Sequence, residues 1–352
     1  MRTLPLHEVH RAAGARLAEA GGAERVESYG DAAKLSAEAR SGAGLVDLSQ
    51  RGRLAVSGPD RVSWLQGMVT ADVKKLAPGQ GTFACIVSPK GKLLAAARIF
   101  AREAELWLDL EESPLEATLD HLRRHLVMEE CEVVDRSAET AMLGLHGPRA
   151  HALLAGLAPG LPELAEHAQA GIALGGVSAV AIGSRELGLP GIDLWLAPGD
   201  AAAAWRALTA AGATLLGFDA TEILRVEAGR PRFGAELDED TLPLEAGLER
   251  AISYDKGCYV GQEVIARMTY RGHANRKLAG LWLEGTAPAA PSEALSRDGK
   301  PVGEIRSSLV SARFGRPVAL AYVRRESLEP GTKLALASGR GATVTALPFE
   351  AP

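Results

Sequence analysis

The feature that most constrains the fold of this chain is a recurring unit, in which an apolar, strand-like run leads through a turn into a helical pattern. Its two clearest copies begin at Leu54 and Met142 and turn at a Gly-Pro pair, and looser copies span residues 106–126 and 193–208. Proline fixes a backbone angle that suits the first turn of a helix, so a Gly-Pro pair after a strand marks a helix start. With further strands between the copies, such as residues 81–87, the pattern predicts α+β layers of a ferredoxin-like kind.

The last part of the chain has a different sequence pattern. From about Lys277, short apolar runs alternate with Gly, Pro and Ser, and turn signals at that spacing predict a small all-β domain. The whole chain has 352 residues, which is more than one hydrophobic core usually supports. We therefore expect two or three domains.

Charge and cysteine content exclude several classes of protein. With 39 basic and 44 acidic side chains, the chain lacks the basic excess of a nucleic-acid binder, so we expect no direct DNA binding. The first residues carry charges every few positions, and no apolar run approaches a membrane span, so neither a signal peptide nor a membrane partner is expected. Cys85, Cys131 and Cys258 are widely spaced, which predicts free thiols in a reducing, cytoplasmic setting and no metal site.

The densest candidate site lies in residues 256–263. Cys258 stands there between two glycines, Gly257 and Gly261, and Lys256 lies two positions upstream. The glycines leave the thiol approachable and let the loop adopt its shape, while the lysine supplies positive charge, and together they favour a reactive thiolate. The alternative is a small, half-buried cysteine that serves only as packing in a helix-entry turn.

The residues after this cysteine predict a helix. Gln262 and Glu263 are typical of a first helical turn, and the helical pattern continues through Arg267. Four residues complete the motif around the thiol: Tyr259, Gln262, Glu263 and Arg267.

Four further segments carry recognisable motifs, within residues 4–100, 224–231, 233–238 and 315–323. These motifs resemble those of the glycine-cleavage T-protein, an aminomethyltransferase. Residues 256–263 are instead similar to the signature of the YgfZ branch of that superfamily, together with Arg267, Tyr270, Arg271 and Gly272. YgfZ proteins bind folate and are linked to the maintenance of iron–sulfur enzymes and to tRNA modification.

The resemblance implies a ring of three domains around a central opening that receives the folate. Two of them are α/β domains of ferredoxin-like or Greek-key type, and the third is a small C-terminal β-barrel. The implied ranges are residues 1–50 with 140–225, residues 51–139 with 226–276, and residues 277–352. The second of these domains carries the Cys258 motif.

One departure from the T-protein pattern bears on the chemistry. That family carries a pair of aspartates on the strand after its hairpin, where an acid group works on the aminomethyl transfer. The paired positions here are Ala95 and Ala96. Loss of a positioned acid or base typically costs roughly 10²- to 10⁴-fold in rate, so the sequence predicts that T-protein aminomethyl transfer is lost.

The resemblance also assigns a folate site. Glu227 matches the glutamate that hydrogen-bonds the pterin in T-protein-like sites, and a carboxylate accepting two parallel N–H bonds suits a pterin edge. The alternative is a solvated helical glutamate between Arg225 and Arg230. The implied cofactor is tetrahydrofolate or a derivative, with Lys256 or Arg230 near its anionic glutamyl tail. Cys258 and Glu227 are then expected to face one cleft.

Two functions remain open at this point. The first, implied by the YgfZ resemblance, is a tetrahydrofolate-binding protein that supports iron–sulfur cluster assembly or repair in client enzymes, including tRNA-modifying ones. Cys258, with Lys256 beside it, would hold iron or sulfur, or form a mixed disulfide with an iron–sulfur client or assembly protein. A single cysteine cannot complete a cluster's thiolate set, so any cluster would be shared. The alternative is a folate-dependent aminomethyl or N-methyl transferase of the T-protein type.

Overall fold

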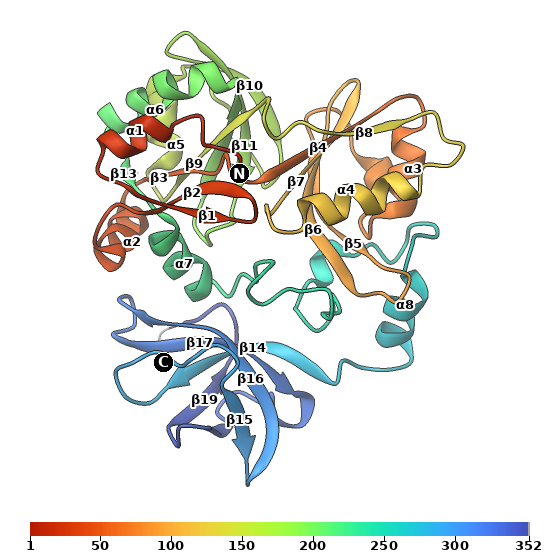
Figure 1. Ribbon diagram of the computed structural model, residues 1–352, viewed down its shortest axis with the longest axis vertical. Helices are drawn as coiled ribbons and strands as arrows, with labels where there is room; N and C mark the ends of the chain where they lie inside the picture. The colour runs from red at the N-terminus through yellow and green to blue at the C-terminus, as the bar shows by residue number, and fades with distance from the viewer. Residues whose placement is uncertain (351–352) are drawn as a thin grey trace. The chain divides into compact units, whose positions relative to one another are not determined.

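The computed structural model describes residues 1–350, and the chain divides into two compact units. Unit 1 comprises Met1–Ile86, Leu94–Thr221 and Ala251–Tyr259. Unit 2 comprises Val87–Leu93, Glu222–Arg250 and the chain from Val260 onward. Helices and strands are mixed along the chain, and the last strands close into a barrel (Figure 1). The predicted α+β class and the predicted C-terminal barrel are therefore confirmed, while the three domain ranges stay a prediction.

Helices follow strands where the sequence indicates them. The α-helices are α1 (His7–Ala12), α2 (Ala32–Ser41), α3 (Arg61–Met68), α4 (Leu115–Arg124), α5 (Ala150–Leu157), α6 (Ala201–Ala210), α7 (Phe218–Glu227) and α8 (Gln262–Tyr270). Short 3₁₀ turns are η1 (Val73–Lys75), η2 (Pro198–Asp200), η3 (Glu249–Ala251) and η4 (Arg325–Ser327). Helices α3 and α5 begin shortly after the two Gly-Pro pairs, and α4 and α6 lie in the two looser copies. All four strand–turn–helix units are confirmed.

Unit 1 contains a six-stranded sheet. Its strands in spatial order are β10 (Gln169–Leu174), β11 (Val177–Ser184), β12 (Gly191–Leu196), β9 (Ala141–His146), β3 (Gly44–Asp47) and β13 (Thr214–Leu215). Neighbouring strands run antiparallel, except for the parallel pair of β3 and β13.

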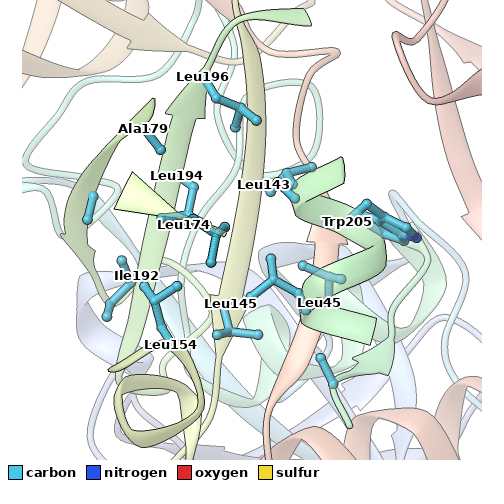
Figure 2. Close-up of a cluster of buried hydrophobic side chains, with 14 of the residues drawn as sticks. Leu45, Leu143, Leu145, Leu154, Leu174, Ala179, Ile192, Leu194, Leu196 and Trp205 are labelled. Atoms are coloured by element: carbon cyan, nitrogen blue, oxygen red, sulfur yellow. The ribbon is translucent and has the colours of Figure 1, made fainter. Parts of the chain in front are cut away.

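The main core of unit 1 lies between this sheet and helices α5 and α6. Alternate residues of a strand point to one face of its sheet, and Leu143 and Leu145 of β9 join Leu194 of β12 on that face. Leu154 of α5 and Trp205 of α6 belong to the same buried cluster (Figure 2). Burial of this apolar surface fixes the sheet against its helices.

A second sheet of unit 1 has five strands. In spatial order they are β5 (Gly81–Val87), β6 (Leu93–Ala101), β7 (Glu105–Leu110), β4 (Gly52–Ser57) and β8 (Glu132–Asp135). A separate two-stranded sheet pairs β1 (Arg16–Ala20) with β2 (Ala23–Ser28). A buried cluster joins the two larger sheets, with Phe100 and Trp107 from one and Met142 and Trp195 from the other.

A buried ion network accompanies this cluster. Arg98 of β6 donates from Nε to Oδ2 of Asp109, its cross-strand partner on β7, over 2.7 Å, and from Nη1 to Asp193 of β12. Arg51 Nε donates to the other Asp109 oxygen over 2.8 Å, and His146 Nε2 lies 3.2 Å from Asp193 Oδ1. Arg98, Asp109, Asp193 and His146 are almost completely buried. The arginine partners hold the pKa values of Asp109 and Asp193 below the usual range, although burial alone would raise them.

The barrel belongs to unit 2. Its strands in closed order are β14 (Arg276–Leu283), β17 (Arg316–Arg324), β16 (Lys300–Ser311), β15 (Ala294–Arg297), β18 (Lys333–Leu336) and β19 (Gly341–Thr345). Its interior is apolar, with Leu281, Ile305 and Leu334 in one buried cluster. The segment after α7 is bonded to the outside of the barrel, because Tyr322 Oη donates to the Glu236 carbonyl over 3.0 Å and Arg306 Nη2 donates to Asp238 Oδ2 over 2.8 Å.

Three further observations concern the cysteines, the length of the helices and the grouping of possible metal ligands. The three cysteines are free thiols, as predicted. No helix in residues 1–350 has the length and apolar character needed to cross a membrane. Across those same residues, no three His, Cys, Asp or Glu side chains are grouped so that they could hold a metal ion.

Asp193→Asn tests the ion network. The neutral amide leaves the buried Arg98 charge without one of its two carboxylates. We therefore expect the free energy of unfolding at pH 7 to fall by about 3–5 kcal/mol. Because the folded pKa of Asp193 is lowered, its contribution is present above the unfolded pKa of about 4 and is lost as the pH falls below that value. Urea denaturation between pH 7 and pH 2 should therefore show that the free energy of unfolding falls less steeply with decreasing pH in the variant than in wild type.

The control for this experiment is Asp120→Asn on the exposed side of α4, where the carboxylate has no bonded partner among the described residues. Its stability should stay within about 0.5 kcal/mol of wild type. An Asp193→Asn protein as stable as this control would contradict the role of the network.

Candidate functional site

The cysteine loop of unit 1 is held by a buried lysine. Lys256 is almost fully buried, and its Nζ donates to the backbone carbonyls of Gln66, Val69 and Ala71 over 2.6, 2.6 and 2.8 Å. These carbonyls lie at and just beyond the end of α3, where helix carbonyls lack partners within the helix. An ammonium has three N–H donors, so the three bonds use all of them. Burial lowers the pKa of Lys256 to about 8.

A second set of bonds fixes the chain just before the lysine. Thr70 Oγ1 donates to the Ala251 carbonyl over 2.6 Å and accepts from the Cys85 N–H over 2.8 Å. The Ser253 N–H donates to the Thr70 carbonyl over 2.9 Å. Residues 251–256 are therefore bonded at several points to the segment that follows α3.

The thiol itself is exposed. Cys258 faces solvent, whereas Tyr259 beside it is buried, with its ring 5.0 Å from Lys256 Nζ. Burial raises the pKa of Tyr259 to about 12, so this ring stays neutral at physiological pH. The packing alternative for Cys258 is wrong, because the side chain is not part of a core. The thiolate stays a prediction, and the ammonium expected to favour it is bonded to backbone carbonyls.

The predicted helix after the motif is confirmed as α8. Gly261 caps it with φ +80°, a left-handed conformation that favours glycine, and a Cβ there would lie 2.5 Å from the Ser88 carbonyl oxygen. Gly257 differs, since it has no positive φ and a Cβ would meet nothing within 4 Å. In α8, Glu263 and Arg267 form an exposed ion pair at 2.7 Å, which contributes only a few tenths of a kcal/mol.

The second part of the candidate site lies in unit 2, at the end of α7. Glu227 is 1% exposed, and its Oε1 accepts a short hydrogen bond from Ser311 Oγ at the end of β16. Ser311 Oγ in turn accepts from the Phe314 N–H over 3.1 Å. A solvated helical glutamate, the alternative interpretation of this position, is therefore wrong. A buried carboxylate fixed by a hydroxyl is a suitable recognition group for an N–H edge.

An arginine network stands beside this glutamate. Arg225 donates to both carboxylate oxygens of Glu222, over 2.8 and 2.7 Å, and to Glu236 Oε2 over 2.8 Å. Its Nη1 also donates to the carbonyl of Arg230 over 2.8 Å, which fixes the turn after α7. The i, i+3 spacing of Glu222 and Arg225 was a usable sequence signal for part of this network. Ser311 gave none, because 84 positions separate it from Glu227.

Ala95 and Ala96, where the resemblance places the acid pair of the T-protein, lie on β6. Ala95 is completely buried and Ala96 half-buried. Neither side chain can accept or donate a proton. Cys258 belongs to unit 1 and Glu227 to unit 2, so the expectation that they face one cleft stays a prediction.

Comparison with known protein families identifies the chain. Residues 6–256 match the GCVT N-terminal domain, and residues 276–352 match the glycine cleavage T-protein C-terminal barrel domain. The chain belongs to the glycine-cleavage T-protein family.

Individual relatives agree with this assignment. An aminomethyltransferase of Rubrobacter xylanophilus is 34% identical, with 93% of this chain and 88% of the relative covered. A putative chloroplastic transferase of Arabidopsis thaliana is 30% identical, with 88% and 72% covered. The crystal structure of the glycine cleavage system aminomethyltransferase T of Bartonella henselae superposes with a TM-score of 0.90 at 26% identity, over 99% of this chain and 98% of that one. These names support the transferase alternative better than the iron–sulfur role, and they leave the YgfZ assignment a prediction.

The two glycines of the motif provide a matched pair of substitutions. Gly261→Ala places a side chain in the left-handed region and against the Ser88 carbonyl, so we expect a loss of at least about 2 kcal/mol in the free energy of unfolding. Gly257→Ala should change it by less than about 0.5 kcal/mol, because the added methyl group meets open space. Urea denaturation measures both. Equal losses in the two variants would contradict the assignment of the conformational constraint to Gly261.

Lys256→Met tests whether the lysine fixes the loop. The variant keeps the apolar stem but leaves three carbonyls without their donor, so we expect a loss of about 2–4 kcal/mol in urea denaturation. Lys74→Met, at an exposed lysine nearby, should stay within about 0.5 kcal/mol of wild type. A Lys256→Met protein of wild-type stability would show that the three bonds contribute little.

Proposed function

We propose that this protein binds a tetrahydrofolate derivative, with Glu227 as the group that recognises the pterin. Family membership supports this, as does the burial of Glu227 beneath the end of the barrel strand β16. Burial of the Glu227 carboxylate costs free energy, which a solvent-exposed glutamate would not cost. Recognition of a ligand N–H edge gives that burial a purpose.

We further propose that Cys258 carries the essential chemistry, in support of iron–sulfur cluster assembly or repair in client enzymes, including tRNA-modifying ones. The observation that carries this proposal is an exposed thiol on a loop fixed by Lys256, in a chain with alanines at the positions of the T-protein acids. In this proposal, Lys256 positions the loop through its three carbonyl bonds. Binding of the folate tail by Lys256 would have to displace one of them, so Arg230 is the better candidate of the two.

The second candidate is a folate-dependent transferase acting on an aminomethyl or N-methyl donor. The names of the relatives favour it. Ala95 and Ala96 weigh against acid catalysis at the family's usual position, because a methyl group can neither accept a proton nor stabilise a developing ammonium. A transferase would need its acid from another residue.

One set of variants tests both parts of the proposal. Calorimetric titration of tetrahydrofolate should show binding to wild type and at least about tenfold weaker binding to Glu227→Gln, since the charged acceptor is lost while Ser311 keeps an oxygen partner. Glu329→Gln, at an exposed barrel glutamate, is the control. Cys258→Ser should bind folate as wild type does but fail to complement a strain deficient in iron–sulfur enzyme maintenance, whereas Cys131→Ser should complement.

The outcomes separate the candidates. A fully active Cys258→Ser protein would refute the role of the thiol. Sustained production of methylene-tetrahydrofolate by wild type from an aminomethyl or N-methyl donor would establish the transferase instead. Absence of folate binding to the wild-type protein would refute both candidate functions.

A further inference from the structure

The loop between α4 and β8 in unit 1 exposes two neighbouring apolar side chains. Val127 is 82% exposed and Met128 is 90% exposed. Within residues 1–350, no other two large apolar side chains that follow each other in the chain are both exposed. Single apolar residues are common on a protein surface, whereas contiguous ones are typical of interaction sites. Residues 126–132 are called the apolar loop below.

One carboxylate fixes the tip of the apolar loop. Glu129 Oε2 accepts hydrogen bonds from the N–H groups of Val127 and Met128, each over 3.1 Å. The backbone of the tip is therefore held within the loop, while both apolar side chains stay in solvent. A surface that is already ordered loses less conformational entropy when it binds a partner.

The apolar loop is also bonded to the start of α3, beside which it passes (Figure 1). The Glu130 N–H donates to Asp60 Oδ2 over 2.8 Å, and the Glu130 carbonyl accepts from the Asp60 N–H over 3.3 Å. Trp64 Nε1 donates to the His125 carbonyl over 3.1 Å. Gly58 permits this close approach, because a Cβ there would lie 2.3 Å from the Glu130 carbonyl oxygen.

The other end of α3 holds the cysteine loop, through the three carbonyl bonds of Lys256. Helix α3 has eight residues and is therefore about 12 Å long. A protein–protein interface of standard size covers about 800 Å² of each partner, which is a patch roughly 30 Å across. One partner protein can therefore contact the apolar loop and Cys258 together.

The exposed apolar side chains of unit 1 gather at these two places. Among its described residues, the large ones that are exposed are Met1, Tyr254, Val127 and Met128. Tyr254 lies four positions before Cys258, in the segment that Lys256 holds. All but Met1 therefore lie at one end of α3 or the other, as expected for a single interaction surface.

The charge of the apolar loop restricts the kind of partner. Residues 127–132 contain no basic side chain and three exposed carboxylates, those of Glu129, Glu130 and Glu132. Arg123 and Arg124, at the end of α4, each donate to a backbone carbonyl of this chain. Apolar side chains with an acidic rim are complementary to an apolar pocket that is bordered by basic residues.

We propose that the apolar loop is the docking site for the protein on which Cys258 acts. The inference rests on the proposed function of the thiol and adds the place where its partner binds. The partner is a protein that covers Val127 and Met128 with an apolar pocket bordered by lysine or arginine. Docking at one end of α3 holds this partner within reach of the thiol at the other end.

Val127→Ser/Met128→Ser tests the inference in the full-length protein. Loss of two central apolar contacts weakens an interface strongly, so we expect complementation of the strain deficient in iron–sulfur enzyme maintenance, measured as client enzyme activity, to fall at least about fivefold. In a Cys131→Ser background, the rate at which Cys258 reacts with the small disulfide 5,5′-dithiobis(2-nitrobenzoate) should stay within about twofold, since the thiol itself is unchanged. The control is Val310→Ser, at an exposed valine of the barrel, which should leave both measurements as in wild type.

Glu130→Lys/Glu132→Lys tests the acidic rim. Reversal of two charges opposes a basic partner, so complementation should fall at least about threefold. The charge-matched control is Glu163→Lys/Glu329→Lys, at exposed glutamates outside the apolar loop, and it should complement as wild type does.

Photo-crosslinking separates a partner protein from a second copy of this chain. With benzoylphenylalanine in place of Met128, we expect an adduct to a different protein in the complementing cells, and we expect the Glu130→Lys/Glu132→Lys substitutions to remove it. An adduct that contains only two copies of this chain would overturn the proposal, because the loop would then be an interface between copies.

The remaining outcomes distinguish the docking site from the function of the thiol. Wild-type complementation by Val127→Ser/Met128→Ser, in a strain where Cys258→Ser is inactive, would overturn the docking site and leave the thiol function intact. An equal fall in the reaction with the small disulfide would show that the substitutions act on the thiol, and would also overturn the docking site. A fully active Cys258→Ser protein would refute the proposed function, and the docking inference with it.

Discussion

The contact between the two larger sheets of unit 1 depends on the buried guanidinium of Arg98. Its partners Asp109 and Asp193 come from different sheets, so the network sets the positions of β6, β7 and β12 together. Inside a protein a charge that loses a partner is costly, and the arrangement therefore tolerates little sliding. Strand β6 carries Arg98 together with Ala95 and Ala96, so the network also fixes the strand on which the resemblance places the acid pair of the T-protein.

The cysteine loop is fixed to the protein at Lys256 and exposed to solvent at Cys258. Lys256 and Tyr259 point inward, and Cys258 between them points to solvent. The bonds from Lys256 to the end of α3 mean that the loop is positioned by helix-end carbonyls that otherwise lack partners. A thiol presented in this way is accessible to a partner protein while its backbone stays fixed. This exposure is the reason why we propose that the thiol acts on a partner protein.

Family membership bears on the ancestry and architecture of the protein, whereas the residues of the site bear on its chemistry. The two matching domains and the T-protein superposition establish ancestry and architecture, and the relatives' names favour transferase chemistry. The residues at the reacting positions decide the chemistry, because fold alone does not determine function. In the function proposed above, Ala95 and Ala96 stand where the resemblance places the acid pair, and the buried Glu227 recognises the pterin. We therefore propose retained folate recognition with altered chemistry.

The sequence by itself determined the features that depend on neighbouring residues. Gly-Pro pairs and apolar runs predicted the strand–turn–helix units, turn spacing predicted that the C-terminal domain is all-β, and the residues after Cys258 predicted α8. Only the tertiary structure decided which groups meet across long separations: Lys256 with carbonyls about 190 positions upstream, and Glu227 with Ser311. Periodicity and turn preference act over a few residues. The burial and hydrogen bonding of a polar group depend on distant segments that no local pattern specifies.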